Sequence, residues 1–357
     1  MKIKYFITSI LAIVILSCGG GDSEDTPIVV APKNLQVVTT IKGASAENPE
    51  GDGSGEVIFK ATADNALSFR LEYGGHQKTM TNGERTVVFV LPGSKTYLVK
   101  ITALGAEGTS ISESVNVNVE RIYDTPIWED NFDVDGAPAN ENWGYDIGTG
   151  SNGWGNNESQ YYTDRTENVE VKDGVLRIKA KKEDYLGSAY TSSRLKTEGK
   201  FDFTYGRVDV KAILPSGGGC WPAIWMLGSN IGTVNWPACG EIDIMEYTSN
   251  SPGSISSAIH NQASYGNTVN VKKVAIQNET DEYHIYSMIW NEDQIYFLLD
   301  DVMYYTYNPV VKSNDNWPFF ANQFLILNVA VGGTLGGSID PGFTESEMVI
   351  DYVRVYE

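Results

Sequence analysis

The sequence of 357 residues is poor in basic side chains and has no long helical repeat. It holds 26 Lys and Arg against 46 Asp and Glu, which gives a formal net charge of −20. Because no basic cluster interrupts this negative charge, we expect no nucleic-acid partner, and sulfated polysaccharides are disfavoured. No stretch keeps a clean period of 3.6 residues, so a fold of alternating strands and helices is disfavoured as well. The apolar content of 41% and aromatic content of 11% are enough to fill the cores of two ordered domains.

An apolar run, residues 6–16, lies near the N-terminus, after two lysines and before Cys18. This run is too short to span a bilayer stably. It resembles a bacterial lipoprotein signal with cleavage before Cys18 and lipid on its sulfur, although Leu16 departs from the small residue usual at that position. Residues 1–17 are therefore predicted to be a signal peptide. The acidic stretch behind Cys18 predicts a flexible tether over 18–30 and resembles a surface-export signal of Bacteroidetes-type lipoproteins, so we expect a lipid-anchored, cell-surface protein of the outer membrane.

Residues 31–122 contain six short alternating runs separated by Gly, Asn or Pro, which predicts a small Ig-like β-sandwich. This segment has no tryptophan and no pair of acids of catalytic type. It resembles the Ig-like or PKD-like modules of bacterial carbohydrate-active enzymes, and both a spacer role and a sugar-binding role stay open. The predicted strands are 35–41, 56–61, 67–73, 85–90, 96–102 and 115–119.

Residues 125–357 form the predicted second domain, and all eight tryptophans lie in it. Its apolar runs again alternate with period two, for example in 206–212, 285–290 and 348–356. About 230 residues of antiparallel strands most naturally form two large packed sheets. We therefore predict an all-β protein in which a β-jelly-roll sandwich follows the smaller sandwich.

The stretch GEIDIMEY, residues 240–247, places three acids at a spacing that fits neither a regular strand nor a helix. A β-bulge at Ile244 and Met245 would return Glu246 to the face shared by Glu241 and Asp243. Three carboxylates on one face suit glycoside hydrolysis, a calcium site or a solvated surface. The apolar neighbours argue against the last of these.

A second pattern, Trp221-Pro-Ala-Ile-Trp225, places two tryptophans on one strand face with only Ala223 between them. Flat rings in an open row can stack on pyranose rings, although buried tryptophan in a core is also common. The pair therefore favours a sugar-binding groove beside the three acids.

Together these motifs resemble glycoside hydrolase family 16, in its laminarinase-like branch, whose signature is Glu-x-Asp-x-x-Glu with a bulge. Further blocks that resemble the family follow in order along the second domain: 155–163, 193–197, 205–207, 219–225 and 327–333.

The resemblance implies a retaining mechanism that needs no catalytic cofactor. Glu241 would be the nucleophile and Glu246 the acid and base, and Asp243 would help to set their ionisation. The resemblance further implies substrate-binding roles for Asn157, Arg194, Trp221, Trp225 and His260. It also implies a structural Ca²⁺ on the convex face, at positions Glu129, Gly174 and Asp351, since oxygen ligands suit this ion.

We accordingly expect a monomeric endo-acting β-1,3-glucanase whose partner is a β-glucan, with mixed β-1,3/1,4-glucan as a second substrate. The alternatives are hydrolysis of agar, porphyran or carrageenan on the same fold, transglycosylation, or glycan binding without catalysis. Cys220 and Cys239 remain outside the leader in a compartment that permits disulfides, and the sequence leaves their pairing open.

Overall fold

The computed structural model describes residues 29–357, so the predicted signal peptide and the lipidation site Cys18 lie outside the described residues. Among the described residues, no helix combines the length and apolar character needed to cross a bilayer. The chain divides into two compact units. Of the described residues, the first unit holds 29–38, Phe59–Arg85 and Val99–Val115, and the second holds Thr39–Ile58, Thr86–Leu98 and Asn116–Glu357. The predicted domain boundaries therefore stay a prediction.

The N-terminal strands form two small sheets, in the orders β1-β2-β5 and β4-β3-β6-β7. Alternate residues are buried, as in β2, where Val57, Phe59 and Ala61 point inward. The sequence missed β4 because this strand carries one large apolar residue, Met80, at its end. The strands are β1 (Lys33–Ile41), β2 (Glu56–Asp64), β3 (Ser68–Tyr73), β4 (His76–Met80), β5 (Glu84–Val88), β6 (Gly93–Leu104) and β7 (Ser110–Arg121), with a short 3₁₀ turn η1 (Ala106–Gly108).

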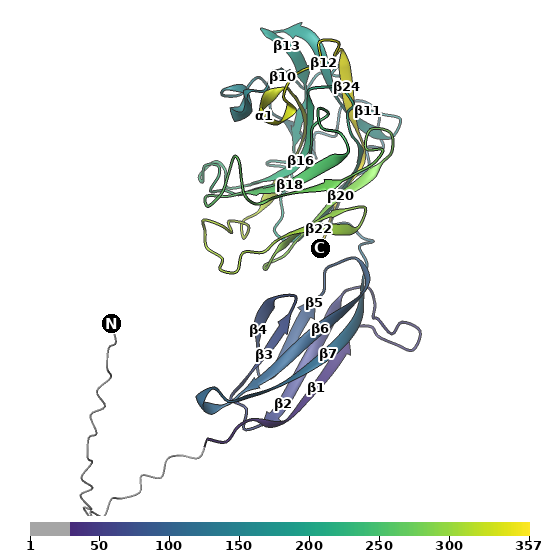
Figure 1. Cartoon of the computed structure of the whole chain (residues 1–357). Coiled ribbons are helices and arrows are strands. Elements are labelled where there is room, and N and C mark those ends of the chain that lie inside the picture. The colour runs from purple at the N-terminus through teal and green to yellow at the C-terminus, as the bar shows by residue number, and fades with distance from the viewer. Residues whose placement is uncertain (1–28) are drawn as a thin grey trace, which may run out of the picture. The chain divides into compact units, whose positions relative to one another are not determined.

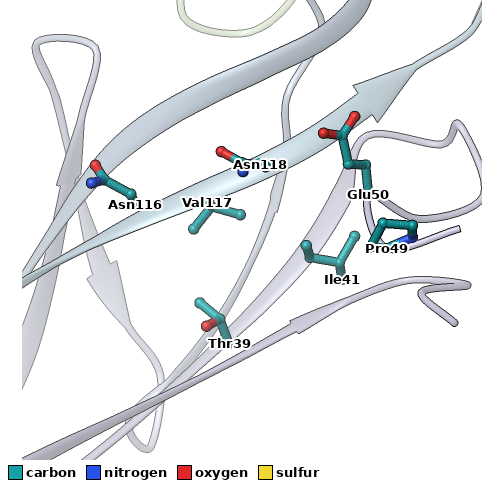
Figure 2. Close-up of a pocket in the computed structure, with 7 residues that line it drawn as sticks. All are labelled: Thr39, Ile41, Pro49, Glu50, Asn116, Val117 and Asn118. Atoms are coloured by element: carbon teal, nitrogen blue, oxygen red, sulfur yellow. The ribbon is translucent and has the colours of Figure 1, made fainter. Parts of the chain in front are cut away.

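Figure 2 shows a pocket beside β1 and β7. Its lining consists of Thr39, Ile41, Pro49, Glu50, Asn116, Val117 and Asn118. None of these seven residues is aromatic, so this pocket has no ring on which a sugar could stack.

The C-terminal strands form the two sheets of the predicted jelly roll (Figure 1). One sheet has ten strands, with the main order β10-β13-β12-β24-β15-β20-β21-β22, to which β11 and β8 add. Its strands are β8 (Trp128–Asp130), β10 (Gln160–Tyr162), β11 (Val169–Lys172), β12 (Val175–Tyr185), β13 (Ser188–Ser192), β15 (Gly206–Ile213), β20 (His284–Trp290), β21 (Ile295–Leu299), β22 (Val302–Tyr307) and β24 (Glu345–Tyr356).

The other sheet has seven strands in the order β19-β18-β17-β16-β23-β14-β9. They are β9 (Gly144–Tyr145), β14 (Arg194–Lys196), β16 (Cys220–Gly228), β17 (Glu241–Tyr247), β18 (Ser254–His260), β19 (Val271–Ala275) and β23 (Gln323–Val331). A five-residue π-helical turn, η2 (Gly153–Asn157), and a four-residue helix, α1 (Gly333–Gly336), accompany them.

One apolar core lies between these two sheets. It unites Val208 and Val210 of β15 with Ile242 of β17 and Leu325 and Leu327 of β23, all fully buried. The inner faces of both sheets are thus covered, and the predicted all-β sandwich is confirmed. The other face of β17, which lies between β18 and β16 in the seven-stranded sheet, carries the candidate site.

Candidate active site

The register of β17 contains the predicted bulge. On β16, the neighbouring residues Ile224 and Trp225 pair with Met245 and Asp243, so that Ile244 is the extra residue on β17. On the other side, β17 has two residues between Asp243 and Glu246, whereas β18 has one between their partners. The bulge is therefore confirmed, because both neighbouring strands are one residue short at this point.

The bulge separates the apolar and acidic side chains of β17. Ile242, Ile244 and Met245 are buried in the core with exposures of 0–1%. Glu241 and Glu246 are partly exposed, and Asp243 between them is 4% exposed. The strand therefore turns its branched residues inward and its three carboxyls toward the open face of the sheet.

A serine on the next strand holds the bulge in place. The Ser257 hydroxyl, which is fully buried, donates to the Ile244 carbonyl oxygen at 2.7 Å and also contacts the Tyr304 hydroxyl. A bulge leaves a backbone group without its ladder partner, and a buried carbonyl needs one. The sequence offered no signal for this contact, because a serine in a strand has no distinctive pattern.

Gly240 sets the start of β17. Its φ is +83°, and a Cβ at this position would lie 2.7 Å from the Pro318 side chain. A glycine is required because no other residue combines that backbone conformation with so close an approach. This turn brings Glu241 into the strand directly after the loop that carries Trp236.

Each glutamate receives one indole N–H. Trp236 Nε1 donates to Glu241 Oε2 at 2.8 Å, and Trp221 Nε1 donates to Glu246 Oε1 at 3.1 Å. Trp236 was missed by sequence reasoning, although its place five residues before Glu241 was available as a signal.

Burial raises the pKa of Glu241, Asp243 and Glu246 each to about 8. The negative charge of Asp243 adds to the rise for both glutamates, and the two indole donors oppose it. Carboxyls this close ionise one after another, so as the pH approaches 8 the cluster passes through states in which one carboxylate is ionised beside a protonated one. The His260 imidazole also opposes the rise in pKa at both glutamates.

His260 lies at the end of β18, opposite Glu241 in the register. Its Nδ1 accepts the backbone N–H of Gly266 at 3.1 Å, so the proton of the neutral ring resides on Nε2. Nε2 lies 3.2 Å from Asp243 Oδ2 and 3.8 Å from Glu241 Oε1. Loop 261–268 thereby sets the tautomer that faces the acids.

The floor of the open face is aromatic, as the alternation on β16 predicts. Trp221 and Trp225 are partly exposed, and Ala223 between them is 7% exposed. Trp225 Nε1 donates to Asn328 Oδ1 at 2.8 Å, and Asn328 Nδ2 in turn donates to the Tyr162 hydroxyl at 3.1 Å. The polar edges of both tryptophans are thus fixed by hydrogen bonds, and Asn328 is a further residue of the site that the sequence analysis did not single out.

Arg194 lies between two indole rings. Its guanidinium carbon is 4.6 Å from the centre of Trp154 and 4.7 Å from that of Trp225. Its Nε is also 3.0 Å from Asp146 Oδ2. Arg194 therefore stabilises the position of Trp225 through cation–π contacts. Its contact with sugar stays a prediction.

With this geometry in place, comparison with known proteins shows which family the chain represents. Residues 156–354 match the family model described as Glycosyl hydrolases family 16. The chain belongs to this family. It is therefore a glycoside hydrolase, and the matched segment contains the bulged strand with its three acids.

Individual relatives of this family 16 chain are similar to about two thirds of its length. A β-glucanase of Rhodothermus marinus is 42% identical over 244 residues, which cover 64% of this chain and 84% of that protein. The crystal structure of a laminarinase from Flavobacterium sp. UMI-01 superposes with a TM-score of 0.62 at 42% identity, covering 65% of this chain and all of that one. A variant of LamA from Z. galactanivorans, solved with laminaritriose and laminaritetraose, is 39% identical with a TM-score of 0.60, covering 66% of this chain and 100% of that one.

Asn157 is the last residue of the π-helical turn η2. The backbone of η2 is left-handed at Trp154 and Asn157, with φ of +54° and +56°. Glu158, the next residue, forms a bridge with Gly332 beyond the end of β23. Such conformations in non-glycine residues concentrate at functional sites, and the exposed side chain of Asn157 is available for the predicted sugar contact.

The predicted calcium positions lie away from the acids, on the ten-stranded sheet. Asp351 Oδ2 is 2.8 Å from Lys211 Nζ, and Glu129 Oε2 is 3.3 Å from Arg354 Nε. Gly174 lies in the turn between β11 and β12, with φ of +75°. The donors are oxygens, as Ca²⁺ prefers, but an ion here would compete with both ion pairs.

Glu241, Asp243 and His260 form a second group with metal-binding atoms, all within 4.8 Å of one another. In this group the imidazole presents a protonated Nε2 to the carboxylates, as described above, and a metal would require that nitrogen to be bare. The arrangement therefore suits proton chemistry.

The cysteines are both free and buried. Cys220 begins β16 and pairs with Val331, whereas Cys239 contacts Gly228 at the other end of that strand. The disulfide that the sequence left open is absent, since the full length of β16 separates the two thiols.

Proposed function

We propose that the protein is an endo-acting, retaining β-glucanase that hydrolyses β-1,3-glucan and also mixed β-1,3/1,4-glucan. The observation that carries this proposal is the bulge, which aligns Glu241, Asp243 and Glu246 on one face above an aromatic floor. The laminarinase and β-glucanase relatives support the choice of substrate. The net charge of −20 supports a neutral polymer over a sulfated one.

The reaction follows from the two glutamates. The Glu241 carboxylate attacks the anomeric carbon while protonated Glu246 gives its proton to the leaving glycosidic oxygen. A glycosyl ester on Glu241 results, and the leaving sugar departs with a free hydroxyl. Glu246, now ionised, takes a proton from water as the water oxygen attacks the anomeric carbon, and Glu241 leaves as a carboxylate. Two displacements restore the β configuration.

The remaining residues support these steps. Trp236 and Trp221 orient the two carboxyl groups through their N–H donors. Asp243 lies between the glutamates, where its charge raises the pKa of both. His260 faces Asp243 through Nε2. We assign Asn157, Trp221 and Trp225 to sugar rings on the non-reducing side of the cleaved bond.

Release of reducing ends from laminarin, lichenan and cellulose tests the proposal. We expect cleavage of laminarin and of lichenan, and little or none of cellulose. Glu241→Gln should abolish turnover while binding of laminarin persists, because the amide keeps the shape of the carboxylate but lacks its nucleophilicity. Failure of the wild-type enzyme on both β-1,3-containing glucans would refute the proposal, and activity on agar or porphyran instead would move it to another polysaccharide.

We further propose a structural Ca²⁺ at Glu129, Gly174 and Asp351, supported by their oxygen donors alone. Chelation should then lower the thermal midpoint and leave kcat at 25 °C unchanged, whereas an unchanged midpoint would argue against the ion. A lipid anchor on Cys18 and a place on the outer surface of the outer membrane are proposed from the leader sequence. Labelling with a radioactive fatty acid, lost in Cys18→Ala, tests the anchor.

A further inference from the structure

An exposed tyrosine lies beside the nucleophile's indole partner. Tyr265, in the loop between β18 and β19, is 50% exposed, and its ring meets that of Trp236 edge to face at 5.4 Å and 80°. Trp236 is itself 43% exposed and donates to Glu241 at 2.8 Å. The two rings therefore form one aromatic surface that extends from the reaction centre into solvent.

The loop that carries Tyr265 is held by hydrogen bonds on both sides of the ring. Before it, the Ala263 and Ser264 amides donate to Asn261 Oδ1. After it, Gly266 donates to His260 Nδ1. The loop thus presents the ring in a defined place, and it is the same loop that sets the tautomer of the active-site histidine.

The order of strands, together with the proposed sugar contacts of Trp221 and Trp225, indicates which end of the substrate this surface meets. Both glutamates lie on β17, so the bond to be cleaved lies over that strand, and the proposed sugar contacts on the neighbouring strand β16 direct the polymer across the sheet. The aromatic floor of Trp221 and Trp225 is on β16, on one side of β17, and His260 with Tyr265 follows from β18, on the other. With the non-reducing sugars over β16 and beyond, the leaving part of the chain meets Tyr265.

We propose that Tyr265 is a specificity-determining residue that binds the glucosyl units on the reducing-end side of the cleaved bond. Tyr265 is then also where an acceptor sugar would bind after the first displacement. In that step an acceptor hydroxyl oxygen attacks the anomeric carbon, its proton passes to the Glu246 carboxylate, and the ester bond to Glu241 breaks. This inference rests on the proposed function, and it adds that Tyr265 sets the ratio of transfer to hydrolysis.

Two substrates with the same non-reducing part separate this role from a structural one. A laminari-oligosaccharide places sugars on both sides of the bond, whereas β-laminaribiosyl fluoride leaves only fluoride on the reducing side. For Tyr265→Ala we expect kcat/KM on the oligosaccharide to fall about five- to tenfold more than on the fluoride, the factor that one aromatic contact contributes. The ratio of transfer to hydrolysis with added laminaribiose as acceptor should fall by a similar factor.

Two variants serve as controls. Tyr265→Phe keeps the ring and should behave as the wild type. Tyr283→Ala removes another exposed tyrosine, next to Lys211 of the ten-stranded sheet, and should change neither substrate. Equal losses on oligosaccharide and fluoride, or an unchanged transfer ratio in Tyr265→Ala, would overturn the assignment while the proposed function stands. A wild-type enzyme inactive on both substrates would overturn the proposed function, and the subsite with it.

Discussion

Replacing Glu241, the proposed nucleophile, should stabilise the protein, and more so as the pH rises. Burial and the neighbouring Asp243 raise the pKa of Glu241 from 4.5 to about 8 in the folded state. The unfolded chain therefore loses this proton at lower pH than the folded protein does. Stability is unaffected below the unfolded pKa and is lost as the pH rises toward 8. Glu241→Gln removes this titration, because the amide carries no charge at any of these values.

The magnitude follows from the size of the shift. A rise from 4.5 to about 8 corresponds to an upper limit of about 5 kcal/mol at 1.36 kcal/mol per unit. The glutamine can still accept the hydrogen bond from Trp236, but it is itself a largely buried polar group, and this burial offsets part of the gain in stability. We therefore expect Glu241→Gln to gain about 1–2 kcal/mol at pH 8, or roughly 2–8 °C in thermal midpoint for a domain of this size.

Thermal unfolding of both proteins between pH 4.5 and 8.5 measures this effect. The difference in midpoint should be small at pH 4.5, grow through neutral pH and level off above 8. Glu345→Gln, an exposed glutamate at the start of β24, is the matched control and should give no pH-dependent difference. A constant difference for Glu241→Gln, or a loss that deepens with pH, would refute the assignment of a buried carboxyl that resists ionisation.

Further predictions concern the groups around the acids. Trp236→Phe removes an N–H that favours the Glu241 anion, so the acidic limb of the kcat/KM profile should move to higher pH; an unmoved limb would contradict this. Ser257→Ala leaves the buried carbonyl of the bulge without its donor and should lower the free energy of unfolding in urea by about 1–3 kcal/mol, together with kcat; a neutral result would mean that the bulge holds without it. Deletion of Met245 should retain some activity on laminarin if the strand returns to regular alternation, whereas Glu246→Ala should lose activity. A deletion variant less active than Glu246→Ala would contradict the role of the bulge.

The acidic face of β17 was predictable because strand geometry has a strict period. Once Glu241 and Asp243 share a face, only an inserted residue can bring Glu246 to it, and both neighbouring strands have the expected irregularity. The same rule placed Trp221 and Trp225 together on β16. Local periodicity thus placed the three acids on one face and the two tryptophans beside them, whereas the catalytic roles of the acids came from the resemblance to family 16.

Local periodicity could not predict contacts between segments that are distant in the sequence. Arg194 is enclosed by Trp154 from a loop and Trp225 from another strand, and no spacing within the sequence links the three. The donor to the bulge, Ser257, depends on the register of β18, which a sequence pattern does not specify. Tyr265 escaped notice for a similar reason, since its importance comes from the position of its loop beside Trp236.

Covalent trapping tests the central claim most directly. The enzyme would be incubated with 2-deoxy-2-fluoro-β-laminaribiosyl fluoride, whose leaving fluoride permits the first displacement while the substituent at C2 slows the second. Mass spectrometry of the intact protein and its peptides would then locate the sugar. We predict one laminaribiosyl adduct on Glu241, formed also by Glu246→Ala because fluoride needs no acid. An adduct on another carboxylate, or products with inverted anomeric configuration, would contradict the account.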